Sequence, residues 1–132
     1  MRRLHHLCIQ TDCYEKSLEF YCKVFDFKVI KESKDFHNRY YNTWLECDGI
    51  MIELQTNKKG ETLIDYSSSN KGLVHFCYYV DDLDNEYNRM KAFGCQFKSK
   101  HGEDIYTVEG GRLLKVIAPE GTIIELRDNP EL

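Results

Sequence analysis

Two histidine–glutamate pairs are the residues of this sequence whose types and spacing could do chemistry. Glu53 follows His6 after 47 positions, and Glu125 follows His75 after 50 positions. Both glutamates interrupt an apolar stretch, where a carboxylate is unfavourable unless it is paired or bound to a metal. Two imidazoles and two carboxylates together would form a mixed nitrogen–oxygen site for a divalent ion, with nickel or zinc favoured and cobalt, manganese or iron(II) also suitable.

The two pairs occupy corresponding places in an internal repeat. The first half begins with HLCIQTDCYEKSLEFYCKVFDF and the second with HFCYYVDDLDNEYNRMKAFGCQF, so each opens with His, an apolar residue and Cys. The halves close with GIMIELQTN and GTIIELRDN, which carry the two glutamates. A lone histidine or glutamate in a strand is more often structural, but duplication at matched positions favours metal ligation. We therefore predict that His6, Glu53, His75 and Glu125 bind one metal ion.

The remaining histidines are weaker candidates. His5 is the alternative to His6, but only His6 has the His-x-Cys counterpart at His75. His37 and His101 have no partner in the repeat, so we expect them on the surface or in loops.

The elements that must position these residues follow from hydrophobic periodicity. Alternation predicts strands over 4–11, 27–32, 40–47 and 49–56, and again over 74–80, 96–99, 111–118 and 122–127. Helical spacing predicts a helix over 14–25, with Leu18, Tyr21, Cys22 and Phe25 as its apolar stripe and Asp12 as N-cap. A second helix carries Leu83, Tyr87 and Met90, with Asp81 or Asp82 as N-cap. The predicted fold is α+β, with two tandem β-α-β-β-β modules forming a curved half-barrel sheet around the metal.

Alternation also predicts which side chains share a face of each sheet. His6, Cys8 and Gln10 fall on one face of the first strand. The face that carries Glu53 also carries Met51 and Gln55, and the equivalent face in the second half carries Ile123, Glu125 and Arg127.

Composition limits the remaining possibilities. The 132 residues suffice for one compact domain, with modules 1–57 and 72–132 joined by a linker over 58–71. The net charge of −4 and the lack of a basic cluster argue against nucleic acid, and no apolar run approaches the ~20 residues of a membrane helix. Six cysteines without CxxC spacing or a secretory signal indicate reduced, mostly buried thiols and a cytoplasmic protein. Open sheet edges predict a homodimer, with the metal site within one chain or shared between chains.

Four stretches, HLCIQTDCYEKSLEFY, IELQTN, VHFCYYVDDLD and APEGTIIELRD, together resemble the vicinal-oxygen-chelate superfamily, which includes glyoxalases, bleomycin-resistance proteins and dioxygenases. The resemblance covers nearly the whole chain and all four predicted ligands. A His-Glu-His-Glu set is most similar to bacterial glyoxalase I, the lactoylglutathione lyases. Extradiol dioxygenases and fosfomycin-modifying relatives typically use His-His-Glu.

This resemblance implies a reaction. Methylglyoxal and a thiol combine spontaneously to a hemithioacetal, which the enzyme isomerises to the S-lactoyl thioester. The metal acts as a Lewis acid that stabilises an ene-diolate, while a carboxylate moves the proton between neighbouring carbons. Glu125 is the first candidate for that base, and Glu53 is its counterpart on the other side.

The resemblance also implies substrate-binding positions. Gln10 lies four residues after His6, where glyoxalase I commonly has an arginine for a glutathione carboxylate, and Asn57 lies four residues after Glu53, at a position that contacts glutathione. Loss of the arginine leaves open that the thiol is not glutathione. Both residues could equally be ordinary polar residues at strand ends. Asp26 replaces a usual glycine, and aspartate tolerates the left-handed conformation.

Two other functions remain open from the sequence. One is a different lyase or isomerase of the superfamily, such as an epimerase, although methylmalonyl-CoA epimerases usually have a glutamine among the ligands. The other is a non-catalytic drug-binding resistance protein with an aromatic cleft. Five aromatic residues could line such a cleft, although a core role is the more common one for them: Tyr40, Tyr41, Trp44, Tyr78 and Tyr79.

Overall fold

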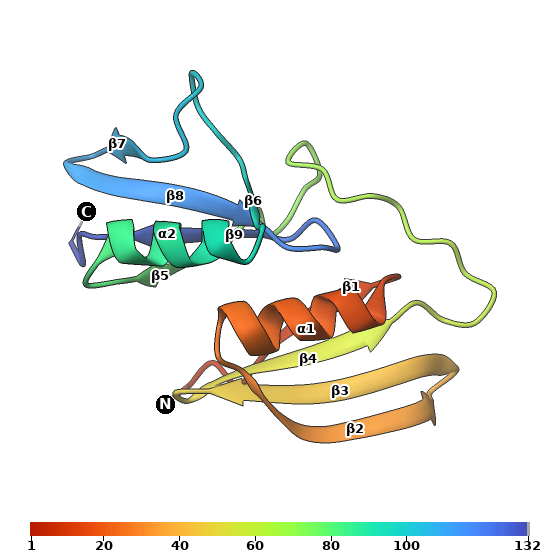
Figure 1. Ribbon diagram of the computed structural model, residues 1–132. Coiled ribbons are helices and arrows are strands. Elements are labelled where there is room, and N and C mark those ends of the chain that lie inside the picture. The colour runs from red at the N-terminus through yellow and green to blue at the C-terminus, as the bar shows by residue number, and fades with distance from the viewer. Residues whose placement is uncertain (132) are drawn as a thin grey trace. The chain divides into compact units, whose positions relative to one another are not determined.

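The computed structural model describes residues 1–131, which divide into two compact units, the second beginning at Tyr66. The elements of the first unit are β1 (Leu7–Thr11), α1 (Tyr14–Val24), β2 (Lys28–Phe36), β3 (Arg39–Cys47) and β4 (Ile50–Thr56) (Figure 1). Those of the second unit are β5 (Phe76–Tyr79), α2 (Leu83–Ala92), β6 (Gln96–Phe97), β7 (Tyr106–Val108), β8 (Gly111–Ile117) and β9 (Ile123–Arg127).

The two sheets have the same connectivity. Their strand orders are β1-β4-β3-β2 and β5-β9-β8-β6, and in each the first strand pairs in parallel with the last. The short strand β7, which the sequence did not predict, pairs with β8 beside this path. The α+β class and the two β-α-β-β-β modules are therefore confirmed.

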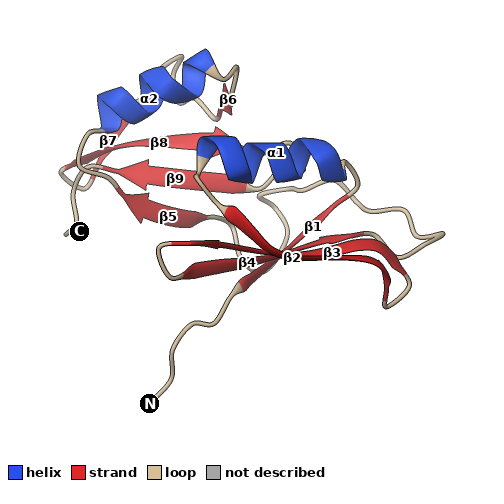
Figure 2. Ribbon diagram, turned by 60° about the horizontal axis from the view of Figure 1, so that its bottom comes forward, coloured by secondary structure: helices blue, strands red, loops and turns tan. Residues whose placement is uncertain are grey.

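Each helix lies over one face of its own sheet and leaves the other face open (Figure 2). In β4, Ile52, Leu54 and Thr56 are buried on the helix side while the residues between them are partly exposed. In the second unit, Leu83 and Met90 of α2 are buried along with Leu114, Val116, Ile124 and Leu126 of the sheet. The alternation of these strands thus separates a packed face from a face that carries the polar residues.

The predicted stripe of α1 is only partly correct. The buried residues of this helix are Tyr14, Ser17, Phe20, Tyr21 and Val24, so Tyr21 is the sole member of the predicted stripe among them. Asp12 is not the N-cap. Cys13 takes that place without a side-chain cap. Thr11 Oγ1 lies 2.8 Å from Ser17 Oγ and accepts from the Cys13 amide.

Other local predictions are confirmed. Asp82 caps α2 by accepting from the Asn85 amide at 3.0 Å. Asp48 and Gly49, both at positive φ, form the two-residue turn between β3 and β4. Asp26 (φ 59°) and Gly94 (φ 78°) adopt the left-handed conformation at the ends of the helices.

The cysteines are more exposed than expected. Cys8 and Cys77 are exposed, the other four are half-buried, and all six are free thiols. Within the described chain, no helix has the length and apolar character needed to cross a membrane.

Candidate metal centre

Each unit brings one predicted histidine to its predicted glutamate on the open face of the sheet. In the first unit, His6 Nε2 lies 3.9 Å from Glu53 Oε1. In the second, His75 Nε2 lies 3.7 Å from Glu125 Oε1. Within residues 1–131, neither unit by itself assembles three or more His, Cys, Asp or Glu side chains that could hold a metal, so each unit offers a pair.

The sheet register explains why both pairs have the same geometry. Cys8 lies opposite Glu53 in the β1–β4 pair, and Cys77 lies opposite Glu125 in the β5–β9 pair. Each histidine stands two residues before its cysteine, just ahead of the first strand of its unit. The repeat in sequence is therefore also a repeat in strand register.

The spacing of both pairs fits shared ligation of an ion. Two atoms bound to one ion are separated by at most twice the metal–ligand distance, roughly 4.2 Å for imidazole nitrogen and carboxylate oxygen. The observed 3.9 and 3.7 Å fall below this upper limit, exceed the ~3.4 Å between two ligands of a tetrahedral ion, and are too long for hydrogen bonds. The residues present thus fit a divalent cation with nitrogen and oxygen ligands.

Neighbouring side chains orient the first pair. His5 Nδ1 lies 2.8 Å from His6 Nδ1, which leaves His6 Nε2 directed at Glu53. The Trp44 ring packs edge-on against His6 with ring centres 4.8 Å apart. The Asn42 amide donates to Glu53 Oε2 at 3.3 Å, so Oε1 remains on the side of the histidine.

The second pair is held differently. Glu125 is only 6% exposed, and its carboxylate faces Lys115 Nζ at 4.0 Å and Arg127 Nη1 at 3.9 Å. His75 Nδ1 is buried and has no hydrogen-bond partner among the described residues. The two halves therefore match in their ligands but differ in the residues around them.

A thiol accompanies each glutamate. Although both cysteines are exposed as whole residues, partial desolvation of the thiol, a hydrogen bond to Glu53 and the charge of that carboxylate raise the pKa of Cys8 to about 11. Partial desolvation, a hydrogen bond to Glu125 and its charge likewise raise the pKa of Cys77 to about 12. Both thiols are protonated near neutral pH and are therefore poor nucleophiles, and the Cys77 thiol donates to the Tyr78 carbonyl at 3.5 Å.

The predicted substrate-binding residues have partners of their own. Gln10 Oε1 accepts from Arg39 Nη1 at 2.6 Å, and the same guanidinium nitrogen donates to the Thr56 carbonyl. A guanidinium from β3 thus lies beside the position where the resemblance implies an arginine. The Asn57 amide donates to the carbonyls of Lys58 and Glu61, so it holds its own loop.

The aromatic residues considered for a drug-binding cleft lie on different faces of the sheets. Tyr41 stacks on Tyr14 of α1 with ring centres 4.1 Å apart, on the helix side of the first sheet. Tyr78 lies opposite the buried Leu126, on the face away from Glu125. Tyr41 and Tyr78 are half-buried, Tyr40 and Tyr79 are exposed, and Trp44 contacts His6.

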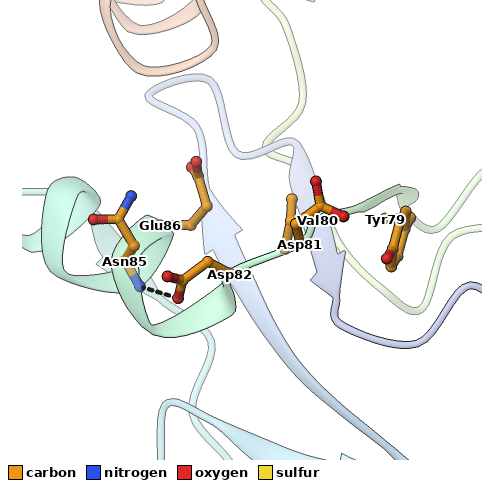
Figure 3. A pocket seen from close by; sticks show the side chains of 6 residues that line it. All are labelled: Tyr79, Val80, Asp81, Asp82, Asn85 and Glu86. Carbon is orange, nitrogen blue, oxygen red and sulfur yellow. Dashed lines mark hydrogen bonds between the residues drawn. The ribbon is translucent and has the colours of Figure 1, made fainter.

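A separate acidic hollow of about 300 Å³ lies at the start of α2 (Figure 3). Its carboxylates serve the helix: Asp82 caps it, and Glu86 pairs with Arg89 at 2.9 Å. Figure 3 shows Asp81 directed away from Asp82, on the side of Tyr79. Neither His75 nor Glu125 lines this hollow.

Comparison with known proteins decides the family. A sequence model of the Glyoxalase/Bleomycin resistance protein/Dioxygenase superfamily matches residues 3–126. The chain belongs to this superfamily. A probable lactoylglutathione lyase of Vibrio cholerae is 27% identical to this chain, and the aligned region covers 98% of this chain and 92% of the Vibrio protein. The lactoylglutathione lyase of Schizosaccharomyces pombe is also 27% identical over 74% of the chain, which spans only 39% of that longer protein.

Solved structures agree on the fold. A glyoxalase family protein from Enterococcus faecalis superposes with a TM-score of 0.82 at 17% identity, covering 96% of this chain and 98% of the other. The fosfomycin resistance protein FosX from Listeria monocytogenes superposes with a TM-score of 0.73 at 18% identity, covering 99% and 93%. That FosX structure contains Mn(II) and 1S,2S-dihydroxypropylphosphonic acid. A protein with this fold thus binds a divalent metal together with a small-molecule ligand.

Proposed function

We propose that this protein is a metal-dependent lyase that isomerises the hemithioacetal of methylglyoxal and a thiol to the S-lactoyl thioester. The observation that carries the proposal is the duplicated His–Glu pair, with one nitrogen–oxygen spacing below 4 Å in each unit. The relatives named lactoylglutathione lyase support the same activity.

His6, Glu53, His75 and Glu125 would hold one divalent ion, for which nickel or zinc is our first expectation. When bound, the ion supplies Lewis-acid stabilisation of negative charge on the two neighbouring oxygens of the substrate. Asn42 and Trp44 keep Glu53 and His6 in the orientation that ligation requires.

We assign Glu125 the role of general base. When it is not bound to the ion, its carboxylate would remove the proton from the carbon that bears sulfur and return it to the adjacent carbon. The hydroxyl proton moves from the oxygen of the first carbon to that of the second, so the product is an isomer of the substrate and no group is gained or lost. Glu53, which lies at the matching register position, is the counterpart for a substrate presented from the other side. Lys115 Nζ and Arg127 Nη1 lie 4.0 and 3.9 Å from the Glu125 carboxylate.

The proposal can be tested with purified protein. The protein is stripped of metal, reloaded with nickel, zinc or manganese, and assayed for thioester formation. Methylglyoxal is supplied with glutathione and, separately, with other low-mass thiols. We expect turnover that a chelator abolishes and added metal restores. Absence of turnover with every metal and thiol would refute the lyase assignment and leave another isomerase, such as an epimerase, or a binding protein.

We also propose that the chain forms a homodimer. In each sheet the parallel strand at one edge, β1 or β5, has a single neighbour, and such edges favour association. Light scattering should give twice the chain mass of 15.7 kDa. A mass of one chain at micromolar concentration would contradict this.

A further inference from the structure

A cationic cavity of about 330 Å³ adjoins Glu125 within the second unit. Four basic side chains line it, those of Lys98, Lys100, Lys115 and Arg127, while Glu125 is its single acidic residue. The net charge of the whole chain is negative, but positive charge is concentrated around this cavity.

Sheet register fixes the position of these cations. Lys115 of β8 lies directly opposite Glu125 of β9, and Arg127 lies two residues further along the same face. The Lys98 amide donates to the Lys115 carbonyl at 2.8 Å, which holds the segment carrying Lys98 and Lys100 against β8. The charges converge because three adjacent segments of backbone bring them together.

Lys115 and Arg127, the two basic residues nearest Glu125, are only partly exposed to solvent. The Lys115 side chain is 23% exposed and the Arg127 side chain 19% exposed. Desolvated cations are unfavourable without a close anionic partner. Glu125 lies at 4.0 and 3.9 Å from them, longer than the ~2.7–2.9 Å of a charge-assisted hydrogen bond. One carboxylate at that distance leaves the excess positive charge uncompensated.

We propose that this cavity binds an oxyanionic group, a phosphate, phosphonate or carboxylate, that the thiol part of the substrate carries. Arg127 Nη2 donates to the Val108 carbonyl at 2.9 Å, which fixes the guanidinium and leaves Nη1 as a donor for an oxyanion, and the lysines provide point charges around it. Assigning the anion to the substrate rests on the proposed function, because Glu125 is shared by the cavity and the metal centre. The binding of an oxyanion in the cavity is independent of the proposed function.

The test measures binding of inorganic phosphate, methylphosphonate and acetate to the full chain by isothermal titration calorimetry, with metal removed and with metal added. Lys115→Met removes a cavity cation, whereas Lys71→Met removes the same charge from an exposed position outside the lining. We expect Lys115→Met to weaken phosphate binding tenfold or more, Lys71→Met to change it less than twofold, and Lys115→Arg to retain it. The stronger of the phosphate and acetate signals identifies the class of oxyanion.

Equal loss in Lys115→Met and Lys71→Met, or no measurable binding of any of the three anions by the wild type, would overturn the proposal. Arg127→Gln provides a second variant if Lys115→Met does not fold, and it too should weaken binding tenfold. Anion binding without lyase activity would support the cavity and count against the proposed function. Lyase activity on a hemithioacetal of an uncharged thiol, without any anion binding, would support the proposed function and count against the anion-binding cavity.

Discussion

Glu125 Oε1 lies 3.7 Å from His75 Nε2, and Glu53 Oε1 lies 3.9 Å from His6 Nε2, so the two sheets present the same pair of candidate ligands. Strand register produces this match, because each glutamate stands opposite the cysteine that follows its histidine by two residues. The proposed function requires the two pairs to act together on one ion.

Replacing Glu125 by Gln removes the proposed base while keeping an oxygen ligand and nearly the same volume. Turnover should fall by ~10² or more, the range expected for loss of a general base, while some metal is retained. Steady-state kinetics with metal analysis checks this, and Glu61→Gln, at an exposed position, is the matched control. An unchanged turnover number would show that Glu125 is not the base.

Replacing His5 by Ala removes the Nδ1 contact at 2.8 Å that orients His6. Loss of a hydrogen bond to a ligating histidine weakens metal binding by about 10–100-fold, and we expect the lower end because His5 is exposed. Competition with a chelating dye measures the affinity. His37→Ala, an exposed histidine in a turn, should have no effect, and equal affinities in both variants would contradict an orienting role for His5.

Replacing Tyr14 by Phe removes a buried hydroxyl that lies 2.5 Å from Glu32 Oε2 and 2.6 Å from Thr43 Oγ1. Both partners then lose a hydrogen bond, so the free energy of unfolding should fall by ~1–3 kcal/mol. Urea denaturation gives the value. Tyr40→Phe, at a side chain 49% exposed, should change stability little; equal effects of the two substitutions would argue against the buried network.

Acid should weaken the link between Arg112 and Asp128. The side-chain hydrogen bond from Arg112, at 3.0 Å, lowers the pKa of Asp128 below its ordinary value of 3.8. Because the folded-state pKa is depressed, the stabilisation is present above pH 3.8 and is lost as the pH falls through the folded-state value. Asp128→Asn should therefore lower stability near neutral pH, by ~1 kcal/mol or less for so exposed a pair, and the difference from wild type should shrink below pH 3.8. A difference that is constant from pH 7 to pH 3 in urea titrations would contradict this linkage.

Periodicity and repetition were sufficient to predict most of the fold from the sequence. Strict alternation around Glu53 and Glu125 predicted which face each glutamate occupies, and the Asp48-Gly49 turn predicted the hairpin between β3 and β4. The His-x-Cys repeat distinguished His6 from His5, and the structure places His6 beside Glu53. These features are local, so they can be read without knowing which segments pair.

What the sequence did not predict depends on contacts between distant segments. The buried stripe of α1 is rotated relative to the predicted one. Tyr14 and Ser17 are buried because their hydroxyl groups have hydrogen-bond partners, in β3 for Tyr14 and at Thr11 for Ser17. Strand β7 is too short to have a period of its own and exists through its pairing with β8.

The cationic cavity also escaped prediction, because its lysines come from segments far apart in the sequence and form no basic run. The alternation in GRLLKVI does place Lys115 on the open face of β8. Only the register with β9 shows that this face is the one that carries Glu125. In the same way, Arg39 is distant in sequence from Gln10, although the two side chains are hydrogen-bonded.

The most direct test of the central claim is the number of metal ions bound per chain, measured by equilibrium dialysis followed by elemental analysis. Wild type should bind one divalent ion per chain, and removal of either pair, by His6→Ala with Glu53→Gln or by His75→Ala with Glu125→Gln, should abolish tight binding. Two ions per chain, or one ion that survives the removal of a whole pair, would contradict a single centre built from both halves.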